Sequence, residues 1–130
     1  VTMVAGEAAM LHYGQDEINR LAILGDRARN GITAAFNDAG VPGQVTGLQS
    51  LLRIHVHNRA LSDYRSSLMS PQEKTFLSLI LSHMRDDGIF VNERGVCSLS
   101  TPMGDAEIDA FLACFRGALD AAKDAPQTAK

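Results

Sequence analysis

Two histidines that stand two residues apart, His55 and His57, are the first candidates for chemistry, because side chains at this spacing on a strand share one face. Two imidazoles placed in this way could chelate a metal ion. A metal site needs a third and usually a fourth ligand, however, and the sequence places neither Cys97 nor His83 beside this strand. We therefore expect the two rings to cover a half-exposed sheet face and predict no metal site, with chelation as the alternative.

The cysteines Cys97 and Cys114 and the serines Ser98 and Ser100 lack the surroundings that turn such groups into nucleophiles. Cys97 has no adjacent base and no helix N-terminus that would favour its thiolate, and both cysteines lie in apolar stretches. The serines lack the Gly-x-Ser-x-Gly elbow of hydrolases, and the chain has neither a P-loop nor a Gly-x-Gly-x-x-Gly motif. We predict structural cysteines and no catalytic residue.

Arg94 is the strongest candidate for ligand binding. It stands in Asn92-Glu93-Arg94-Gly95, which has the length and the glycine of a hairpin turn between two short apolar segments. A guanidinium at the tip of a hairpin can bind a carboxylate of a ligand or partner through parallel hydrogen bonds. On spacing alone, a solvated turn arginine is the alternative.

The composition limits the classes of function that the chain could have. Its 130 residues are 45% hydrophobic and 21% charged, which is typical of one globular domain. The formal charge of -3 repels a phosphate backbone, so we expect no nucleic-acid partner. We also expect no membrane association, because no apolar run reaches the roughly 18 to 20 residues that span a bilayer. No segment reads as a signal peptide and cysteines are few, which favours a cytoplasmic location.

Apolar periodicity predicts an α+β domain. Gly40 is expected to end the longest helix, and Ser70-Pro71-Gln72-Glu73 is a capping-box pattern that begins another. The pattern predicts helices over 1–14, 16–39 with Asp16 as N-cap, 70–87 and 105–122, and strands over 44–47, 50–56, 89–91 and 96–99. Residues 58–69 are expected to be a loop that carries a short helical turn, and 124–130 a frayed tail. Together these elements predict a small, mainly antiparallel sheet with the helices packed on one face.

Five segments, in this order and spacing, resemble the C-terminal part of the class III pyridoxal-phosphate-dependent aminotransferases, in particular the glutamate-1-semialdehyde 2,1-aminomutase-like branch. They are Val1–Gly6, Asn19–Gly31, Gly47–Ser50, Met84–Val91, and Leu99–Pro102 followed by Asp105–Asp109. The first of them lacks both an N-cap and an initiating Met, so we expect the chain to be cut from a longer protein. The resemblance covers nearly the whole chain and implies a single C-terminal small domain over 1–130.

The resemblance implies a fold-type I enzyme in which a missing large domain, joined through helix 1–14, holds pyridoxal phosphate. The small domain would pack on that domain, close the active site, and use Arg94 to orient a substrate carboxylate. The parent would be a homodimer that acts on a small amino acid or amino ketone. Lys74, Lys123 and Lys130 lack the sequence context of the family's cofactor lysine, so we expect no cofactor and no catalysis in this chain alone.

The chain departs from the aminomutase branch, since it lacks a Pro-Ser-x-Phe-Glu segment and a Ser-x-Ala-His-Thr segment. This departure argues against strict semialdehyde aminomutase activity. A free-standing α+β module that binds a small ligand or a protein, without catalysis, is the alternative to the enzyme hypothesis.

Overall fold

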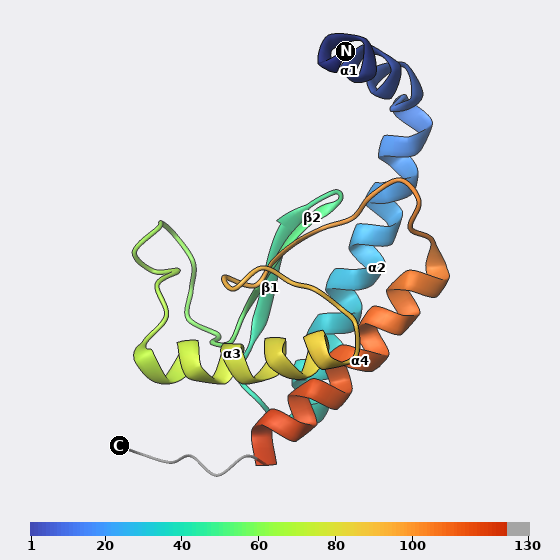
Figure 1. The fold of residues 1–130 in the computed structure, drawn as a ribbon. Helices are drawn as coiled ribbons and strands as arrows, with labels where there is room; N and C mark the ends of the chain where they lie inside the picture. Colours follow the sequence, from blue (N-terminus) through green and yellow to red (C-terminus); the bar gives the residue numbers. More distant parts are fainter. Residues whose placement is uncertain (125–130) are drawn as a thin grey trace.

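The fold is α+β, with four helices and one antiparallel sheet among residues 1–124, which are the residues that this computed structural model describes (Figure 1). The elements are α1 (Thr2–His12), α2 (Gln15–Ala39), β1 (Gln44–Leu48), β2 (Leu51–His55), α3 (Pro71–Asp86), β3 (Val96–Ser98) and α4 (Asp105–Asp124). This confirms the predicted fold class. The tail predicted at 124–130 lies outside the described residues except for Asp124, which is the last residue of α4.

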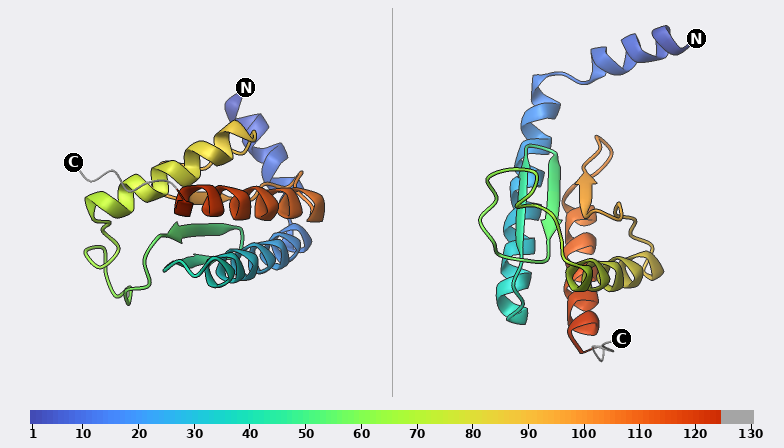
Figure 2. Two further views of the ribbon diagram at one scale, coloured as in Figure 1. Left: turned by 90° about the horizontal axis from the view of Figure 1, so that it is seen from below. Right: turned by 90° about the vertical axis from the view of Figure 1, so that its left-hand side faces the viewer.

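The sheet has the order β1-β2-β3, with both neighbouring pairs antiparallel. Strand β2 is central, and its Leu52 and Ile54 are buried on the face that meets the helices. Helix α2 packs on β1 and β2 and also along α4, while α3 packs across α4 (Figure 2). The largest fully buried side chains include Phe36 of α2 and Phe115 of α4, whose rings meet edge to face at 5.4 Å. One core therefore joins the sheet to three of the helices.

Helix α2 ends where the sequence predicts and begins slightly earlier. Gly40 has a left-handed φ of 66°, and its amide donates to the last turn, as a helix-ending glycine should. The N-cap is Gly14 rather than Asp16. Asp16 instead lies in the first turn, where its negative charge still complements the helix dipole.

Helix α3 confirms the predicted capping box. The Ser70 amide donates to Glu73 Oε2 at 2.8 Å, and the Glu73 amide donates to Ser70 Oγ at 3.2 Å. Pro71 stands at the first helical position, where no amide hydrogen is needed. These contacts fix the start of α3 and the end of the loop before it.

The strand predicted at 89–91 is wrong, and the sheet has three strands instead of four. Gly88, with φ of +84°, ends α3, and the amide of Ile89 donates back to Met84 O at 2.8 Å. Val91 then buries its side chain in the core, while Phe90 is exposed. The alternation that resembles a strand is thus a helix end followed by an anchored coil. Strand β3 pairs with β2 instead, through Arg53↔Val96 and its neighbours.

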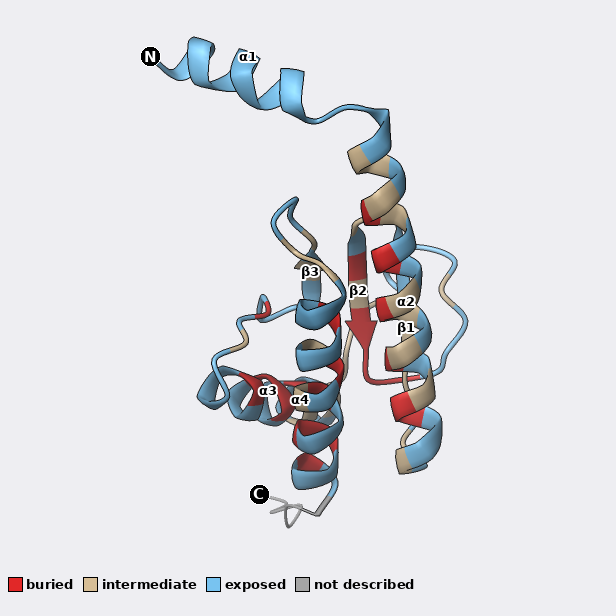
Figure 3. Cartoon of the chain, turned by 90° about the vertical axis from the view of Figure 1, so that its right-hand side faces the viewer, coloured by how far each residue is buried: buried red, intermediate tan, exposed pale blue. Residues whose placement is uncertain are grey.

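Helix α1 confirms the helix predicted at the start of the chain, yet it has no buried residue (Figure 3). Its apolar side chains are exposed, and they include Met3, Val4, Met10 and Leu11. Among the described residues, no helix is both long enough and apolar enough to cross a membrane.

Gly25 lets α2 approach the β1–β2 turn, and this contact generates a stability prediction. A Cβ at Gly25 would lie 1.8 Å from the carbonyl oxygen of Gln49, which is backbone and has little room to move. We expect Gly25→Ala to lower the free energy of unfolding by about 1–3 kcal/mol despite the better helix propensity of alanine. In α4, a Cβ at Gly117 would meet nothing within 4 Å, so Gly117→Ala should raise the free energy of unfolding by up to about 1 kcal/mol. Urea unfolding of the wild type and the two variants measures both changes in the free energy of unfolding. Equal effects of the two substitutions would contradict the prediction.

Candidate functional site

Arg94 stands in a turn that is fixed to the sheet. The Gly95 amide donates to Asn92 O at 2.8 Å, and the Arg94 amide donates to Asn92 Oδ1 at 2.8 Å. Gly95 adopts a φ of +74°, and a Cβ there would lie 2.6 Å from Ile54 O, so only glycine fits this close approach to β2. The Ile54 amide in turn donates to Gly95 O at 2.9 Å. The turn predicted at 92–95 is therefore confirmed, although its first arm is coil.

The side chain of Arg94 is exposed, and among the described residues no hydrogen bond or ion pair engages its guanidinium. By contrast, Arg20, Arg27, Arg29 and Arg59 all pair with carboxylates. A guanidinium on a rigid backbone with free donors can accept a carboxylate in bidentate geometry. Arg65, Arg85 and Arg116 also make no ion pair among the described residues, but Arg94 is the unpaired arginine on a turn that hydrogen bonds join to the sheet.

An open groove of about 730 Å³ begins at the same turn. Asn92 and Val96, on either side of Arg94 in sequence, belong to its lining, and its far wall is α4. Its apolar lining includes Leu52, Ile89, Val91, Ile108 and Phe111. The groove offers a mostly apolar surface that begins at the Arg94 turn, with Glu107 also in its lining. It was not predicted, because its residues come from six separate segments.

Both cysteines have the properties of structural thiols, in agreement with the prediction. Burial raises the pKa of Cys97 to about 12. Burial and the neighbouring Asp87 carboxylate also raise the pKa of Cys114. Both thiols are free, and a raised pKa favours the protonated form over the thiolate that acts as a nucleophile.

His55 and His57 are adjacent, with ring centroids 5.6 Å apart, but they do not cover a half-exposed face. That prediction is wrong, because only 2% of His55 and 3% of His57 is exposed. Gln44 of β1 holds the chain just after β2 through the carbonyls of His57 and Arg59, at 3.1 and 2.7 Å. No group of three or more His, Cys, Asp or Glu side chains that could hold a metal occurs in the described part of the chain.

The loop that follows β2 is tied back to α3 by Arg59. Its guanidinium contacts both carboxylate oxygens of Glu73 and donates to Leu68 O at 3.0 Å. The hydrogen bond from Arg59 lowers the pKa of Glu73 to about 2. Within the loop, Ser66 and Asp63 exchange hydrogen bonds around a short turn, as predicted for 58–69. Arg59 thus keeps this loop, and the histidines that precede it, in one position.

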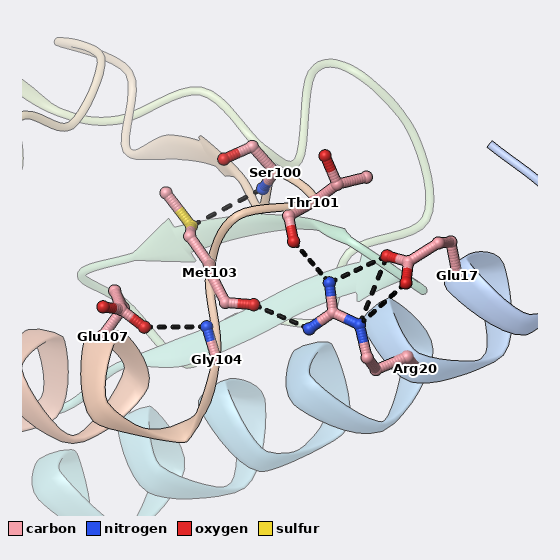
Figure 4. Close-up of polar contacts among 7 residues, drawn as sticks. All are labelled: Glu17, Arg20, Ser100, Thr101, Met103, Gly104 and Glu107. Carbon is pink, nitrogen blue, oxygen red and sulfur yellow. Dashed lines mark hydrogen bonds and ion pairs between the residues drawn. The ribbon is translucent and has the colours of Figure 1, made fainter. Parts of the chain in front are cut away.

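Arg20 of α2 fixes the chain between β3 and α4 (Figure 4). Its guanidinium donates to Met103 O at 2.7 Å and Thr101 O at 2.5 Å, and it pairs with Glu17 at 2.8 Å. A little further on, the Gly104 amide donates to Glu107 Oε2 at 2.7 Å, which holds the start of α4. The segment after the Arg94 turn and β3 is therefore fixed at its far end as well. Residue spacing alone could not reveal a contact between positions 81 to 83 residues apart.

Comparisons with known proteins agree with the resemblance read from the sequence. No family model matches the chain. The beta-phenylalanine transaminase of Variovorax paradoxus is 30% identical over 117 residues, which are 88% of this chain and 26% of that protein. The crystal structure of an omega-transaminase from Sphaerobacter thermophilus superimposes with a TM-score of 0.92 at 45% identity, over 94% of this chain and 28% of that one. The chain is homologous to part of the class III pyridoxal-phosphate-dependent transaminases.

The crystal structure of a beta-phenylalanine aminotransferase from Variovorax paradoxus is a further structural relative of this transaminase segment, with a TM-score of 0.72 at 25% identity. It is matched over 79% of this chain and 24% of its own length. The segment thus spans about a quarter of the length of the transaminases that it matches. The semialdehyde aminomutase branch is not among these relatives.

Pyridoxal phosphate needs a lysine for covalent attachment and an acidic partner for its ring nitrogen. In the transaminase segment, Lys74 is exposed on α3, and Lys123 pairs with Asp120 near the end of α4. Neither lysine lines the groove beside Arg94, and Lys130 lies outside the described residues. The described residues do not fit the cofactor by themselves, and Arg94 is the candidate for ligand binding in this segment.

The buried histidines of the transaminase segment generate a pH prediction. Burial, with smaller effects from Arg53 and His57, lowers the pKa of His55 from 6.5 to about 4. The unfolded chain therefore takes up a proton at His55 between about pH 6.5 and pH 4 that the folded chain does not, so stability is lost as the pH falls through this window. The loss should reach about 2–3 kcal/mol, measured by urea unfolding across that range.

His55→Gln is the control for the pH prediction, because glutamine does not titrate and can still bond to Thr46, which His55 contacts at 2.9 Å. The variant should lose the part of the decline that His55 causes and keep the part that comes from His57, whose pKa burial also lowers. Glu73, whose pKa is lowered from 4.5 to about 2, adds its own loss of stability at the acid end of this window, so the two proteins are compared above about pH 5. If the NMR signals of His55 titrated near pH 6.5, the prediction would be wrong.

Proposed function

We propose that the chain is the C-terminal small domain of a pyridoxal-phosphate-dependent transaminase and that Arg94 binds the carboxylate of the substrate. The exposed Arg94 guanidinium carries this proposal. It stands on a turn that hydrogen bonds within residues 92–95 and from Ile54 and Arg53 hold in place, and it has no carboxylate partner among the described residues. The homology to transaminases supports the class of reaction.

The parent protein of this proposal has a large domain that precedes α1 and holds the cofactor. A transaminase needs a lysine that the segment does not supply, and the segment matches about a quarter of its relatives' length. The exposed apolar side chains of α1 support a role as the connection to that domain. In this proposal the parent protein is a cytoplasmic homodimer that acts on a small amino acid or amino ketone.

Transamination is favoured over an aminomutase reaction. The matched relatives are named as transaminases, and the sequence lacks the two motifs of the semialdehyde aminomutases. The cofactor supplies the electron sink for amino transfer when it is bound. The contribution of this segment is to orient the substrate: a carboxylate held by two parallel N–H donors has one defined direction, which places its amino group reproducibly.

The first test is the full-length product of the native gene. We expect an intact mass about three to four times that of this segment and absorbance between about 330 and 430 nm from bound pyridoxal phosphate. Reduction with borohydride should fix the chromophore to the protein, and peptide mapping should locate it before Val1. A colourless product that stays colourless with added pyridoxal phosphate would overturn the proposal and favour a non-catalytic binding module.

Substitution of Arg94 tests its assigned role. Arg94→Ala in the full-length enzyme should lower kcat/KM for an amino acid donor by about 10- to 100-fold, because hydrogen bonds to a charged group contribute roughly 1.5–3 kcal/mol. Arg94→Lys keeps the charge but loses the bidentate geometry, so its kcat/KM should lie between that of Arg94→Ala and that of the wild type.

Arg116→Ala is the matched control, since Arg116 is an exposed arginine on α4 away from the Arg94 turn. It should leave kcat/KM close to that of the wild type. Equal kcat/KM values for the Arg94→Ala variant and the wild type would remove Arg94 from the carboxylate site.

A further inference from the structure

Arg53 of β2 makes a contact that the proposed function leaves unexplained. Its side chain is half-buried in the central strand, opposite Val96 of β3 and Thr46 of β1. Its Nε–H donates to the main-chain carbonyl of Arg94 at 3.3 Å. A charged donor in the middle of the sheet is thus directed at the residue that we assign to the substrate carboxylate.

The electrostatics of this contact favour a role in positioning. Two guanidinium groups repel each other, so the attraction between the two residues is limited to the Arg53 side chain and the Arg94 carbonyl. No ion pair among the described residues neutralises either cation. Arg53 therefore holds the backbone of Arg94 and at the same time disfavours a conformation in which the Arg94 side chain folds back onto the sheet.

The other hydrogen bonds of the turn do not join the Arg94 backbone to a side chain of the sheet, as the bond from Arg53 does. Two of the hydrogen bonds of Arg94 and Gly95 are made to Asn92, within the turn itself. One joins Gly95 to the backbone of Ile54. Among the described residues, Arg53 supplies the side-chain hydrogen bond that joins the sheet to Arg94 itself. The sheet thus restrains the backbone of Arg94 itself, from which its side chain leaves, and not only the place of the turn.

We propose that Arg53 is a positioning residue for carboxylate recognition, acting through the Arg94 carbonyl rather than by contact with the substrate. This inference rests on the proposed carboxylate role of Arg94. It identifies the substrate class more closely as amines that carry a carboxylate, because the residue that Arg53 holds in place is the one that would bind a carboxylate.

The test compares two aminooxy reagents that share a reacting nitrogen and differ in a carboxylate, namely aminooxyacetate and methoxyamine. Both change the absorbance of bound pyridoxal phosphate in the full-length protein, and the ratio of their second-order rate constants measures recognition of the carboxylate. We expect Arg94→Gln to lower this ratio by about 10- to 100-fold. Arg53→Gln should lower it by about 3- to 10-fold, since the carboxylate-binding group remains but is less well oriented.

The double variant distinguishes positioning from direct contact. If Arg53 acts through Arg94, Arg53→Gln should lower the ratio no further in the Arg94→Gln background. A further loss in that background would mean that Arg53 acts on the carboxylate by itself, and would overturn the positioning role. Arg116→Gln, the same chemical change on an exposed face of α4, is the matched control and should keep the wild-type ratio.

The outcomes separate this inference from the proposed function. If Arg94→Gln lowers the ratio and Arg53→Gln does not, the positioning role is wrong and the carboxylate site stands. If Arg94→Gln has no effect, the carboxylate site itself is wrong. If Arg53→Gln does not fold, Arg53→Lys carries the test, because its ammonium can reach the same carbonyl, and it should lower the ratio by about two- to three-fold. An Arg53→Lys ratio equal to that of Arg116→Gln would then overturn the inference.

Discussion

Strand β2 is the element on which the rest of this structure depends, because it is paired on both edges and used on both faces. One face buries Leu52 and Ile54 against the helices and so fixes the core. The other face carries Arg53 and His55, and the Arg94 turn is bound to its edge through Ile54 and Arg53. A central strand can do this because successive side chains alternate between faces while the backbone donors and acceptors lie in the plane between them. Core and candidate site are therefore not separable parts of this domain.

The helices, and the fold class that they imply, could be predicted because their signals are local. Helix periodicity, the Ser70 capping box and the glycine at position 40 each depend on residues within one or two turns. The failure at 89–91 has the opposite origin. Ile89 and Val91 alternate as in a strand, but the amide of Ile89 is already bonded to the end of α3, and β3 has its partner in β2, which is more than 40 positions away. Strand pairing is decided between segments, so a single segment does not reveal it.

The residues of the candidate site also differ in whether their signals are local in the sequence. Arg94 could be identified from the turn that carries it and from the family resemblance, since both are local in sequence. The residues that hold Arg94 and the following segment in place could not be identified in this way. Arg53 lies 41 positions away, and Arg20, which fixes the following segment, is bonded to residues 81 and 83 positions away. The burial of His55 and His57 was missed for a related reason: alternation shows that the two share a face, but it does not show how far other segments bury that face.

Most of the arginines that join elements of this acidic segment are already paired with carboxylates of the chain, so they are not free to bind a ligand. Arg20, Arg27, Arg29 and Arg59 are each paired with a carboxylate and join distant elements to one another. Such pairs at exposed positions contribute little stability individually, but they satisfy the cation and fix its direction. Arg53 and Arg94 differ because a carbonyl, and not a carboxylate, lies between them. Under the proposed function their charge is left for the substrate carboxylate. The groove that begins at the same turn is lined mostly by apolar side chains, although the Glu107 carboxylate also lines it. An anionic head with an apolar body is the chemistry that such a surface selects.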